Sequence, residues 1–294
     1  MPKITNNPNL DSIRIAGTGS YLPDKVLTND DLAKMVDTSD EWIVSRTGIR
    51  ERRIASDAQA TSDLATNAAR HAMEQAGVTA EELDLIIVAT VSPDTFFPAT
   101  ACYVQKNLIA KNAICFDLSA ACSGFLYAMS VARQFISTHS CDTALIIGAE
   151  KLSSMVNWED RNTCVLFGDG AGAAILQRAT EEGDHGVLST YMGSDGNQTD
   201  ILVVPGGGSA CPITPSNSEQ RLNTISMQGR EVYRYAVTAM RNACDRVLLD
   251  AKLKPEDITM VIPHQANLRI IDAIRERLNV PQEKMFVNLD KYGN

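Results

Sequence analysis

One of the seven cysteines lies where a thiol could be reactive. Cys122 follows the strand-like run NAICFDLSAA and precedes SGFLYAMSVARQFIST, whose apolar side chains recur at helical spacing. At the amino end of a helix, free N–H groups and the helix dipole favour the thiolate over the thiol. The small residues Ala120, Ala121 and Gly124 leave room for a substrate carbonyl near the Cys122 N–H, a potential oxyanion donor. Position alone leaves a nucleophile and a buried inert thiol equally open.

One of the four histidines lies in a similar turn. His264 ends the apolar strand pattern ITMVIP and begins HQANLRIIDAIRERL, whose apolar stripe predicts a helix. Sites in open α/β sheets form at the carboxyl ends of strands, so His264 is the second candidate for chemistry. A structural, hydrogen-bonding histidine is the competing interpretation. The remaining histidines, His71, His139 and His185, are predicted to be solvated.

Helical and strand patterns alternate around these two residues and predict an α/β fold with buried strands. Helices are expected over residues 61–75 and from about residues 100 and 122, and strands over residues 83–90, 114–118, 143–148 and 170–176.

The order of these parts repeats within the chain. Residues 76–93 and 251–266 share a helix end, a short loop, an acidic pair, an apolar strand and a further loop. Aligning Leu83 with Ile258 gives an offset of 175 residues, which also pairs strand-like residues 12–16 with 187–191. The repeat predicts two similar halves, residues 1–180 and 181–294, although any α/β protein can show such look-alikes. With this offset the counterpart of Cys122 falls just past the last residue, so we expect a second half truncated at its carboxyl end.

Composition excludes several classes of function. A net charge of −9 argues against nucleic acid as the main partner, because phosphate binding needs a basic surface. No segment is long enough to span a membrane and the amino terminus lacks a secretion signal, so a cytoplasmic protein is expected. The cysteines are scattered without a CxxC pair, which indicates neither disulfides nor a metal site. The segment GDGAGAAI lacks the spacing of a dinucleotide fingerprint.

Taken together, the segments resemble β-ketoacyl-acyl-carrier-protein synthase III, the initiating condensing enzyme of type II fatty-acid synthesis. The matching stretches, in order, are GTGSYLP, DTSDEWIVSRTGIRERRIA, DLSAACSGFLYA, LFGDGAGAAIL, MQGREVY, PHQANLRII and YGN. The resemblance implies a thiolase-like fold with two similar halves in a five-layered αβαβα arrangement, as a homodimer. It also implies that a final helix and a glycine-rich hairpin follow the YGN position, which again leads us to expect a truncated second half.

The resemblance implies a catalytic triad of Cys122, His264 and Asn294. Cys122 would accept the acyl group of an acyl-coenzyme A primer. Malonyl-acyl-carrier protein would then lose carbon dioxide, His264 and Asn294 would stabilise the enolate, and attack on acyl-Cys122 would release a 3-oxoacyl product. No metal and no cofactor are implied, because coenzyme A takes part as the substrate thioester.

Further positions carry over as binding residues. Trp42 and Arg161 match residues that sandwich the coenzyme A adenine, Arg46 and Thr38 match residues that assist them, and Asn267 matches one that lines the pantetheine tunnel.

Two contacts with other proteins are also implied. Phe97 matches a residue that reaches across the dimer to floor the partner's acyl pocket. Arg234, Arg269 and Arg277 match basic residues around the tunnel mouth, where they would meet an acidic carrier protein, although Arg277 could equally be a solvated surface charge.

Two other functions stay open at this point. The chain could be a related acyl transferase or thioesterase that uses acyl-Cys122 without decarboxylation, which would show no dependence on malonyl-carrier protein. It could also be an inactive fragment that binds acyl-coenzyme A or carrier protein, but such a protein has no need of a nucleophile. The sequence leaves the chain length and branching of the primer open.

Overall fold

The computed structural model describes residues 12–179 and 186–294, which fall into two compact units. The first unit comprises the chain up to Asp24, Ala55–Lys151 and Gly170–Met192. The second comprises Lys25–Ile54, Leu152–Asp169 and Gly193–Asn294. Each unit therefore combines segments that are far apart in the sequence. The predicted boundary between residues 180 and 181 lies outside the described residues.

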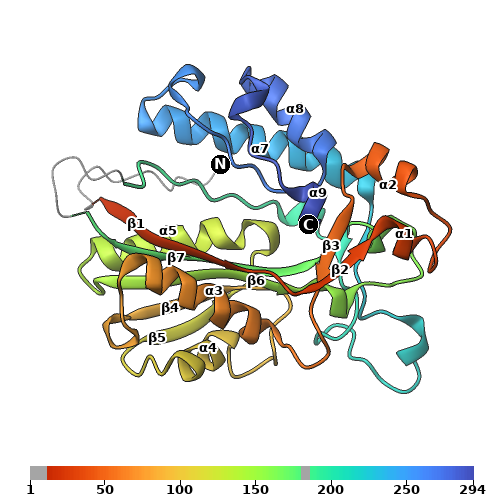
Figure 1. The fold of residues 1–294 in the computed structure, drawn as a ribbon, viewed down its shortest axis with the longest axis horizontal. Coiled ribbons are helices and arrows are strands. Elements are labelled where there is room, and N and C mark those ends of the chain that lie inside the picture. Colours follow the sequence, from red (N-terminus) through yellow and green to blue (C-terminus); the bar gives the residue numbers. More distant parts are fainter. Residues whose placement is uncertain (1–11, 180–185) are drawn as a thin grey trace. The chain divides into compact units, whose positions relative to one another are not determined.

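The first unit is built on a five-stranded sheet with the strand order β1-β7-β6-β4-β5 (Figure 1). Its strands are β1 (Ile13–Tyr21), β4 (Leu85–Ala89), β5 (Ile114–Leu118), β6 (Thr143–Lys151) and β7 (Asp169–Arg178). Strand β4 runs parallel to both β5 and β6, and β1 runs antiparallel to β7. All five residues of β4 are buried, as expected of a parallel strand covered on both faces.

Helices cover both faces of this sheet (Figure 1). On one face, Ile86 and Val88 of β4 pack with α3 (Thr61–Ala76) and α4 (Thr100–Leu108). On the other face, Leu85, Ile87 and Ala89 pack with α5 (Gly124–Ser137). The alternation follows from the period of two residues in a strand. The predicted α/β fold is confirmed for this unit.

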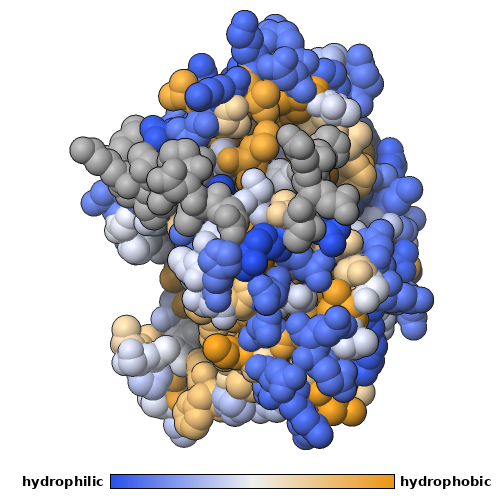
Figure 2. All heavy atoms as spheres, turned by 90° about the vertical axis from the view of Figure 1, so that its left-hand side faces the viewer, coloured by the Kyte–Doolittle hydropathy of each residue, from blue (hydrophilic) through white to orange (hydrophobic). Residues whose placement is uncertain are grey.

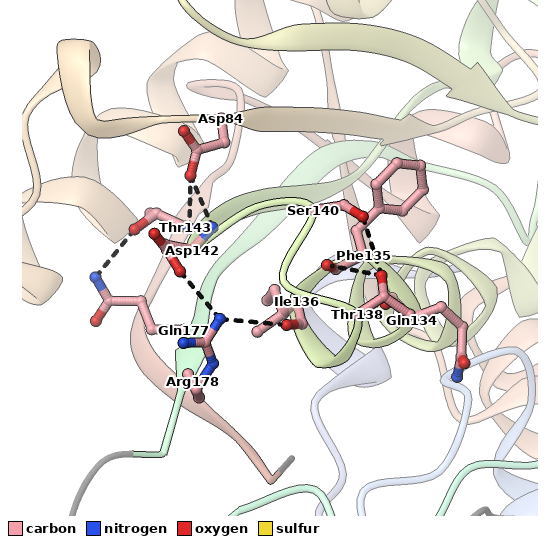
Figure 3. Close-up of polar contacts among 10 residues, drawn as sticks. All are labelled: Asp84, Gln134, Phe135, Ile136, Thr138, Ser140, Asp142, Thr143, Gln177 and Arg178. Atoms are coloured by element: carbon pink, nitrogen blue, oxygen red, sulfur yellow. Dashed lines mark hydrogen bonds and ion pairs between the residues drawn. The ribbon is translucent and has the colours of Figure 1, made fainter. Parts of the chain in front are cut away.

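Polar contacts fix the edge of the sheet where β4 and β6 begin (Figure 3). The Asp84 carboxylate accepts hydrogen bonds from the N–H groups of Asp142 and Thr143, at 2.8 and 3.0 Å. Arg178 at the end of β7 pairs with Asp142 at 3.0 Å, and Gln177 donates to the Thr143 hydroxyl at 3.3 Å. These contacts join the start of β4, the start of β6 and the end of β7 on one side of the sheet. The carboxyl ends of β4 and β5 lie on the opposite side, where they are followed by loops.

The second unit is mainly helical. Its strands form two antiparallel pairs, β2 (Lys25–Thr28) with β3 (Glu51–Ile54) and β8 (Leu202–Val203) with β9 (Ser226–Met227). Its helices are α1 (Asn29–Leu32), α2 (Asp40–Thr47), α6 (Arg161–Cys164), α7 (Gly229–Ala251), α8 (Leu268–Leu278) and α9 (Leu289–Tyr292). The predicted stripe of α8 is confirmed, because Ile271, Ile274 and Leu278 are buried in one cluster with Leu32 and Ile43.

Short 3-10 turns link the longer elements. They are η1 (Ala80–Glu82), η2 (Ala121–Ser123), η3 (Leu152–Met155), η4 (Gly196–Gln198), η5 (Ser218–Gln220), η6 (Pro255–Asp257) and η7 (Gln282–Lys284).

The structure reproduces the internal repeat in the backbone itself. Helices α3 and α7 end at Ala76 and Ala251, 175 residues apart, and each is followed by a residue in the left-handed conformation, Gly77 and Lys252. A 3-10 turn then follows in both halves. In η1 the Glu82 carboxylate accepts the Thr79 N–H at 2.8 Å, and in η6 the Asp257 carboxylate accepts the Lys254 N–H at 2.9 Å. The order of helix end, left-handed residue and 3-10 turn therefore recurs in both halves at this point of the chain.

Beyond this point the offset changes. The parallel bridge between Val261 and Met285 corresponds to the pair Ile86 and Cys115, with separations of 175 and 170 residues. The segment between the two paired positions, which includes the helix, is thus five residues shorter in the second half. With an offset of 170 residues, the counterpart of Cys122 is Tyr292, inside α9. The constant offset that placed this counterpart past the last residue therefore does not hold beyond the bridge.

Two strands predicted in the second half do not form. Residues 187–191 are not in a strand, although the Val187 N–H donates to the Ile13 carbonyl of β1 at 2.8 Å. The predicted strand ITMVIP, residues 258–263, is reduced to the Val261 bridge, and Met260 and Ile262 are exposed. A strand needs neighbours for its N–H and C=O groups, and local sequence does not reveal whether they are present.

The surface of the described residues mixes polar and apolar areas. Hydrophilic side chains cover much of the face in Figure 2, with apolar side chains between them. No helix of the described residues combines the length and the apolar character that a membrane span requires.

The two glycines of the GTGS segment let β1 lie directly against α3. A Cβ on Gly17 would lie 2.5 Å from the Ala72 carbonyl oxygen and 2.6 Å from the Ala76 nitrogen. By contrast, a Cβ on Gly172 of the neighbouring strand β7 would have no atom within 4 Å apart from those of its chain neighbours.

We predict that Gly17→Ala lowers the free energy of unfolding by about 1–3 kcal/mol or more, because the added methyl forces a buried helix away from the sheet. Gly172→Ala is the matched control and should stay close to wild type. Urea denaturation measures both variants, and equal stabilities would contradict the close-packing account.

Candidate active site

Cys122 lies in the tight turn between β5 and α5. The preceding residue, Ala121, has a positive φ of 43°, which is strained for a residue with a side chain. A Cβ on Gly124 would lie only 2.9 Å from the Ala89 Cβ, so the start of α5 touches the carboxyl end of β4. Of the seven cysteines, Cys122 alone is exposed. The thiol therefore lies just after the carboxyl end of β5, in the strand-to-helix turn that was predicted.

The surroundings of Cys122 favour its neutral form. Although the residue is accessible at the surface, the nearby protein excludes water and raises the pKa of the thiol, and the negative charge of Glu150 adds to the rise. A backbone hydrogen bond lowers the pKa but does not outweigh these effects. The amino end of the helix alone thus does not supply the thiolate that the sequence suggested. Removal of the proton needs a base.

Glu150 organises the loop that follows β4, a role that the sequence did not reveal. Its carboxylate, at the end of β6, accepts the N–H groups of Val91 and Ser92 at 2.9 and 3.1 Å. It also accepts the hydroxyls of Ser92 and Thr90 at 2.5 and 3.2 Å. Burial raises the pKa of Glu150, whereas these four donors favour the ionised form.

The same loop displays two aromatic rings. Phe97, which the sequence singled out, and its neighbour Phe96 are each 86% exposed. The base of the loop is fixed, because Asp94 accepts the Ser62 N–H at 2.8 Å and the Ser62 hydroxyl at 2.6 Å. A loop that is anchored at its base by Asp94 thus carries two large apolar side chains exposed to solvent.

His264 lies in the second unit, in the turn between Val261 and α8. Burial lowers the pKa of its imidazole, which is therefore neutral at neutral pH. Within the described parts of the chain, neither ring nitrogen has a hydrogen-bond partner. Gln265, which the sequence analysis passed over, holds the turn by donating to the Pro263 and Phe286 carbonyls at 2.9 and 3.1 Å. The imidazole is thus held in place but is free to bind another group.

Asn294 follows α9 in the same unit. Gly293 has φ +67° and ψ −155°, a conformation that only glycine adopts readily. The Asn294 N–H donates to the Leu166 carbonyl at 2.8 Å, and the Asn294 carbonyl accepts the Gly168 N–H at 2.9 Å. The backbone is therefore fixed on both sides, while the side-chain amide bonds to none of the residues that the structure describes.

Trp42, Arg46 and Arg161 form one aromatic and cationic cluster. The guanidinium carbons of Arg46 and Arg161 lie 4.4 and 5.0 Å from the centroid of the Trp42 ring. Arg161 also donates to the Asp37 carbonyl at 2.7 Å. The nearby Thr38 hydroxyl is buried without a partner among the described residues.

Helix α8 anchors the end of α2 beside this cluster. The Asn267 side chain caps α8 by accepting the Arg269 N–H at 2.9 Å, and it donates to the Arg46 carbonyl at 3.1 Å. The Arg269 guanidinium donates to the Ser45 carbonyl at 2.8 Å. The structure thus brings Trp42 together with five of the predicted residues, Thr38, Arg46, Arg161, Asn267 and Arg269.

The other two predicted basic residues differ in their surroundings. Arg234 on α7 pairs with Glu231 at 2.6 Å and lies 5.1 Å from the Tyr235 ring centroid. Arg277 is exposed in the last turn of α8 and has no partner among residues 12–179 and 186–294.

The predicted site residues are thus divided between the units: Cys122 and Phe97 belong to the first, and all the others to the second. Among the described residues, no three His, Cys, Asp or Glu side chains are grouped as a metal site requires.

Known proteins share this fold and sequence. A family model described as 3-oxoacyl-[acyl-carrier-protein] synthase III matches residues 116–196, and the model of its C-terminal part matches residues 248–294. The chain is 57% identical over 280 residues to a β-ketoacyl-[acyl-carrier-protein] synthase III of Caldanaerobacter subterraneus. These 280 residues are 95% of this chain, and the match covers 84% of the relative.

Solved structures match as well. The 3-oxoacyl-[acyl-carrier-protein] synthase III of Aquifex aeolicus has a TM-score of 0.87 at 50% identity, covering 96% of this chain and 86% of that one. A priming β-ketosynthase of the R1128 polyketide pathway also has a TM-score of 0.87, at 33% identity, covering 100% of this chain and 86% of that one.

These matches confirm the predicted thiolase-like fold and define the class of the protein, a condensing acyltransferase. Within that class, the chain belongs to the β-ketoacyl-[acyl-carrier-protein] synthase III family.

We predict that Glu150→Gln lowers the pKa of Cys122, because removing a nearby negative charge favours the thiolate. The pH dependence of Cys122 alkylation by iodoacetamide measures this change, and its midpoint should move to lower pH. Glu81→Gln, at an exposed position, is the control and should leave the midpoint in place. A midpoint that stays put or rises in Glu150→Gln would show that Glu150 does not act on the thiol.

Proposed function

We propose that the protein condenses an acyl-coenzyme A primer with malonyl-acyl-carrier protein to initiate fatty-acid synthesis. The products are 3-oxoacyl-acyl-carrier protein, free coenzyme A and carbon dioxide. Membership of the synthase III family carries the proposal. The presentation of Cys122, His264 and Asn294 in three fixed turns supports it.

In the first stage Cys122 attacks the primer thioester. Its sulfur forms a bond to the carbonyl carbon, and the coenzyme A thiolate leaves and takes up a proton. Because the surroundings raise the pKa of Cys122, its proton must pass to a base as the attack begins. A neutral imidazole can accept it, and His264 is the predicted site residue in that state.

In the second stage malonyl-carrier protein loses carbon dioxide and leaves an enolate. The developing negative oxygen needs preorganised donors. A neutral imidazole keeps one N–H and the Asn294 side chain offers an NH₂ group, and neither is used by the described residues. The enolate carbon then attacks the acyl-Cys122 carbonyl and releases the cysteine sulfur.

Trp42 and its two arginines suit the adenine end of coenzyme A. A flat base stacks at about 3.5 Å from each neighbour, so it needs about 7 Å between Trp42 and Arg161. Arg161 now lies 5.0 Å from the ring centroid, and its guanidinium must swing outward to admit the base. The Thr38 hydroxyl is buried and has no partner among the described residues, so its donor and acceptor are left for a ligand. Asn267 uses its amide to cap α8 and hold α2, so we assign it a shaping role.

Contacts with other proteins complete the proposal. An acidic carrier protein would be attracted more to Arg269 and Arg277 than to Arg234, because Arg234 pairs with the Glu231 carboxylate whereas Arg269 bonds to a neutral carbonyl. The exposed Phe97 suits insertion into a second copy of the chain in a homodimer. Cytoplasmic location and independence of a cofactor stay predictions.

Product formation from acyl-coenzyme A and malonyl-carrier protein tests the proposal. Cys122→Ala should abolish the 3-oxoacyl product. Asn294→Ala should lower carbon dioxide release by about a hundredfold, because one oxyanion donor is lost. Cys102→Ala, a change of the same kind on α4, should retain the wild-type rate. Product formation that survives in Cys122→Ala, or that does not require malonyl-carrier protein, would refute the proposed reaction.

We further predict that Trp42→Ala raises KM for acyl-coenzyme A about tenfold with little change in kcat, because stacking binds the substrate far from the reacting atoms. Trp42→Phe keeps an aromatic face and should lose less. Steady-state kinetics over a range of acyl-coenzyme A concentrations measure both variants. An unchanged KM in Trp42→Ala would place the adenine elsewhere.

A further inference from the structure

Arg52 is a buried cation in the second unit, and neither stage of the proposed reaction uses it. It lies on β3 with no exposed surface. Among the described residues it has no carboxylate partner. Burial lowers its pKa to about 10, so the guanidinium is still charged at neutral pH. A buried charge without a counter-ion is unfavourable unless neutral dipoles satisfy it.

Neutral oxygens on three segments bind the two terminal nitrogens of the guanidinium, while its Nε is buried without a partner among the described residues. Both terminal nitrogens donate to the Asn29 side-chain oxygen at 2.9 Å. One of them also donates to the Leu27 carbonyl at 3.1 Å, and the other donates to the Val165 carbonyl at 2.9 Å. Arg52 therefore joins β2, the start of α1 and the segment that follows α6.

One side of this network leads to Asn294. Just after Val165, the Leu166 carbonyl and the Gly168 N–H are the two groups that hold the Asn294 backbone. The Cβ of Arg52 packs against the backbone of Gly168 and Gly293, the residues next to these contacts. A Cβ on Gly168 would lie 3.1 Å from the Arg52 Cβ, and one on Gly293 would lie 3.2 Å from it.

The other side leads to α2. Asn29 is buried, and its NH₂ group donates to the Asp40 carboxylate and to the Ile49 carbonyl, both at 2.8 Å. Asp40 is the first residue of α2, the helix that carries Trp42 and Arg46. The Asn29 amide thus stands between the guanidinium and a carboxylate, and the dipoles along this chain strengthen one another.

We infer that Arg52 is a positioning residue, which fixes the backbone of Asn294 and, through Asn29 and Asp40, the start of α2. This inference rests on the proposed function, in which Asn294 acts on the enolate. A donor misplaced by about 1 Å can lower a rate about a hundredfold. Acylation of Cys122 does not use Asn294. Loss of Arg52 should therefore separate the two stages of the reaction.

Arg52→Lys tests the Asn294 side, because it keeps the charge but cannot make the forked contacts. Carbon dioxide release by pre-acylated protein should fall tenfold or more, while the fraction of Cys122 that acyl-coenzyme A acylates should stay at the wild-type level. Arg50→Lys is the matched control. Arg50 is exposed two residues away, its side chain has no described partner, and both readouts should be unchanged.

Asp40→Ala tests the α2 side. It removes the far end of the chain of hydrogen bonds from an exposed position and leaves the contacts of Arg52 intact. KM for acyl-coenzyme A should rise severalfold, and carbon dioxide release by pre-acylated protein should be unchanged. A fall in that release would overturn the division of roles.

Gly168→Ala keeps the test independent of the charge, in case Arg52→Lys fails to fold. Its Cβ would lie 2.7 Å from the Tyr292 carbonyl oxygen, so it displaces the same backbone and should also slow carbon dioxide release selectively. Wild-type rates in the folded variants, or equal losses in both stages, would overturn the positioning role. If wild-type protein shows neither stage, the proposed function fails, and the inference fails with it.

Discussion

The proposed chemistry depends on turns whose backbone has almost no freedom. Cys122 follows a residue in the left-handed region, and Gly124 lies so close to Ala89 that no side chain fits between them. Asn294 follows Gly293, whose conformation few other residues adopt, and is paired on both sides with the segment after α6. Because close contacts fix the backbone in these turns, the side chains of Cys122 and Asn294 do not need hydrogen bonds of their own to stay in position. That combination suits groups that must bind a substrate.

The electrostatic state of the resting protein follows from the same burial. Exclusion of water raises the pKa of Cys122 and lowers that of His264, so both side chains are neutral near pH 7. Charge then develops only as the reaction proceeds. Cations persist in two other settings: stacked on Trp42 near the surface, and enclosed by neutral oxygens at Arg52. At Arg52, hydrogen bonds to neutral amide and carbonyl oxygens stabilise the charge in place of a carboxylate.

Local pattern was sufficient to predict the elements that carry the candidate residues. The strand-to-helix turn at Cys122 follows from an apolar run and helical periodicity, the helix after His264 follows from its apolar stripe, and the repeat follows from matching helix ends. The sequence could not reveal Arg52, whose partner Val165 lies 113 residues away, nor Glu150, whose carboxylate binds a loop about 58 residues earlier. The two missing strands failed for a related reason, because a strand depends on neighbours that its own residues do not specify.

The measurement that tests the central claim most directly is the mass of the intact protein after mixing with acetyl-coenzyme A and with longer acyl-coenzyme A thioesters, followed by peptide mapping. The account predicts one acyl group, located on the peptide that contains Cys122 and absent when that residue is alanine. An adduct on a different cysteine, an adduct that persists in Cys122→Ala, or no adduct with any donor would contradict the assignment of Cys122 as the nucleophile.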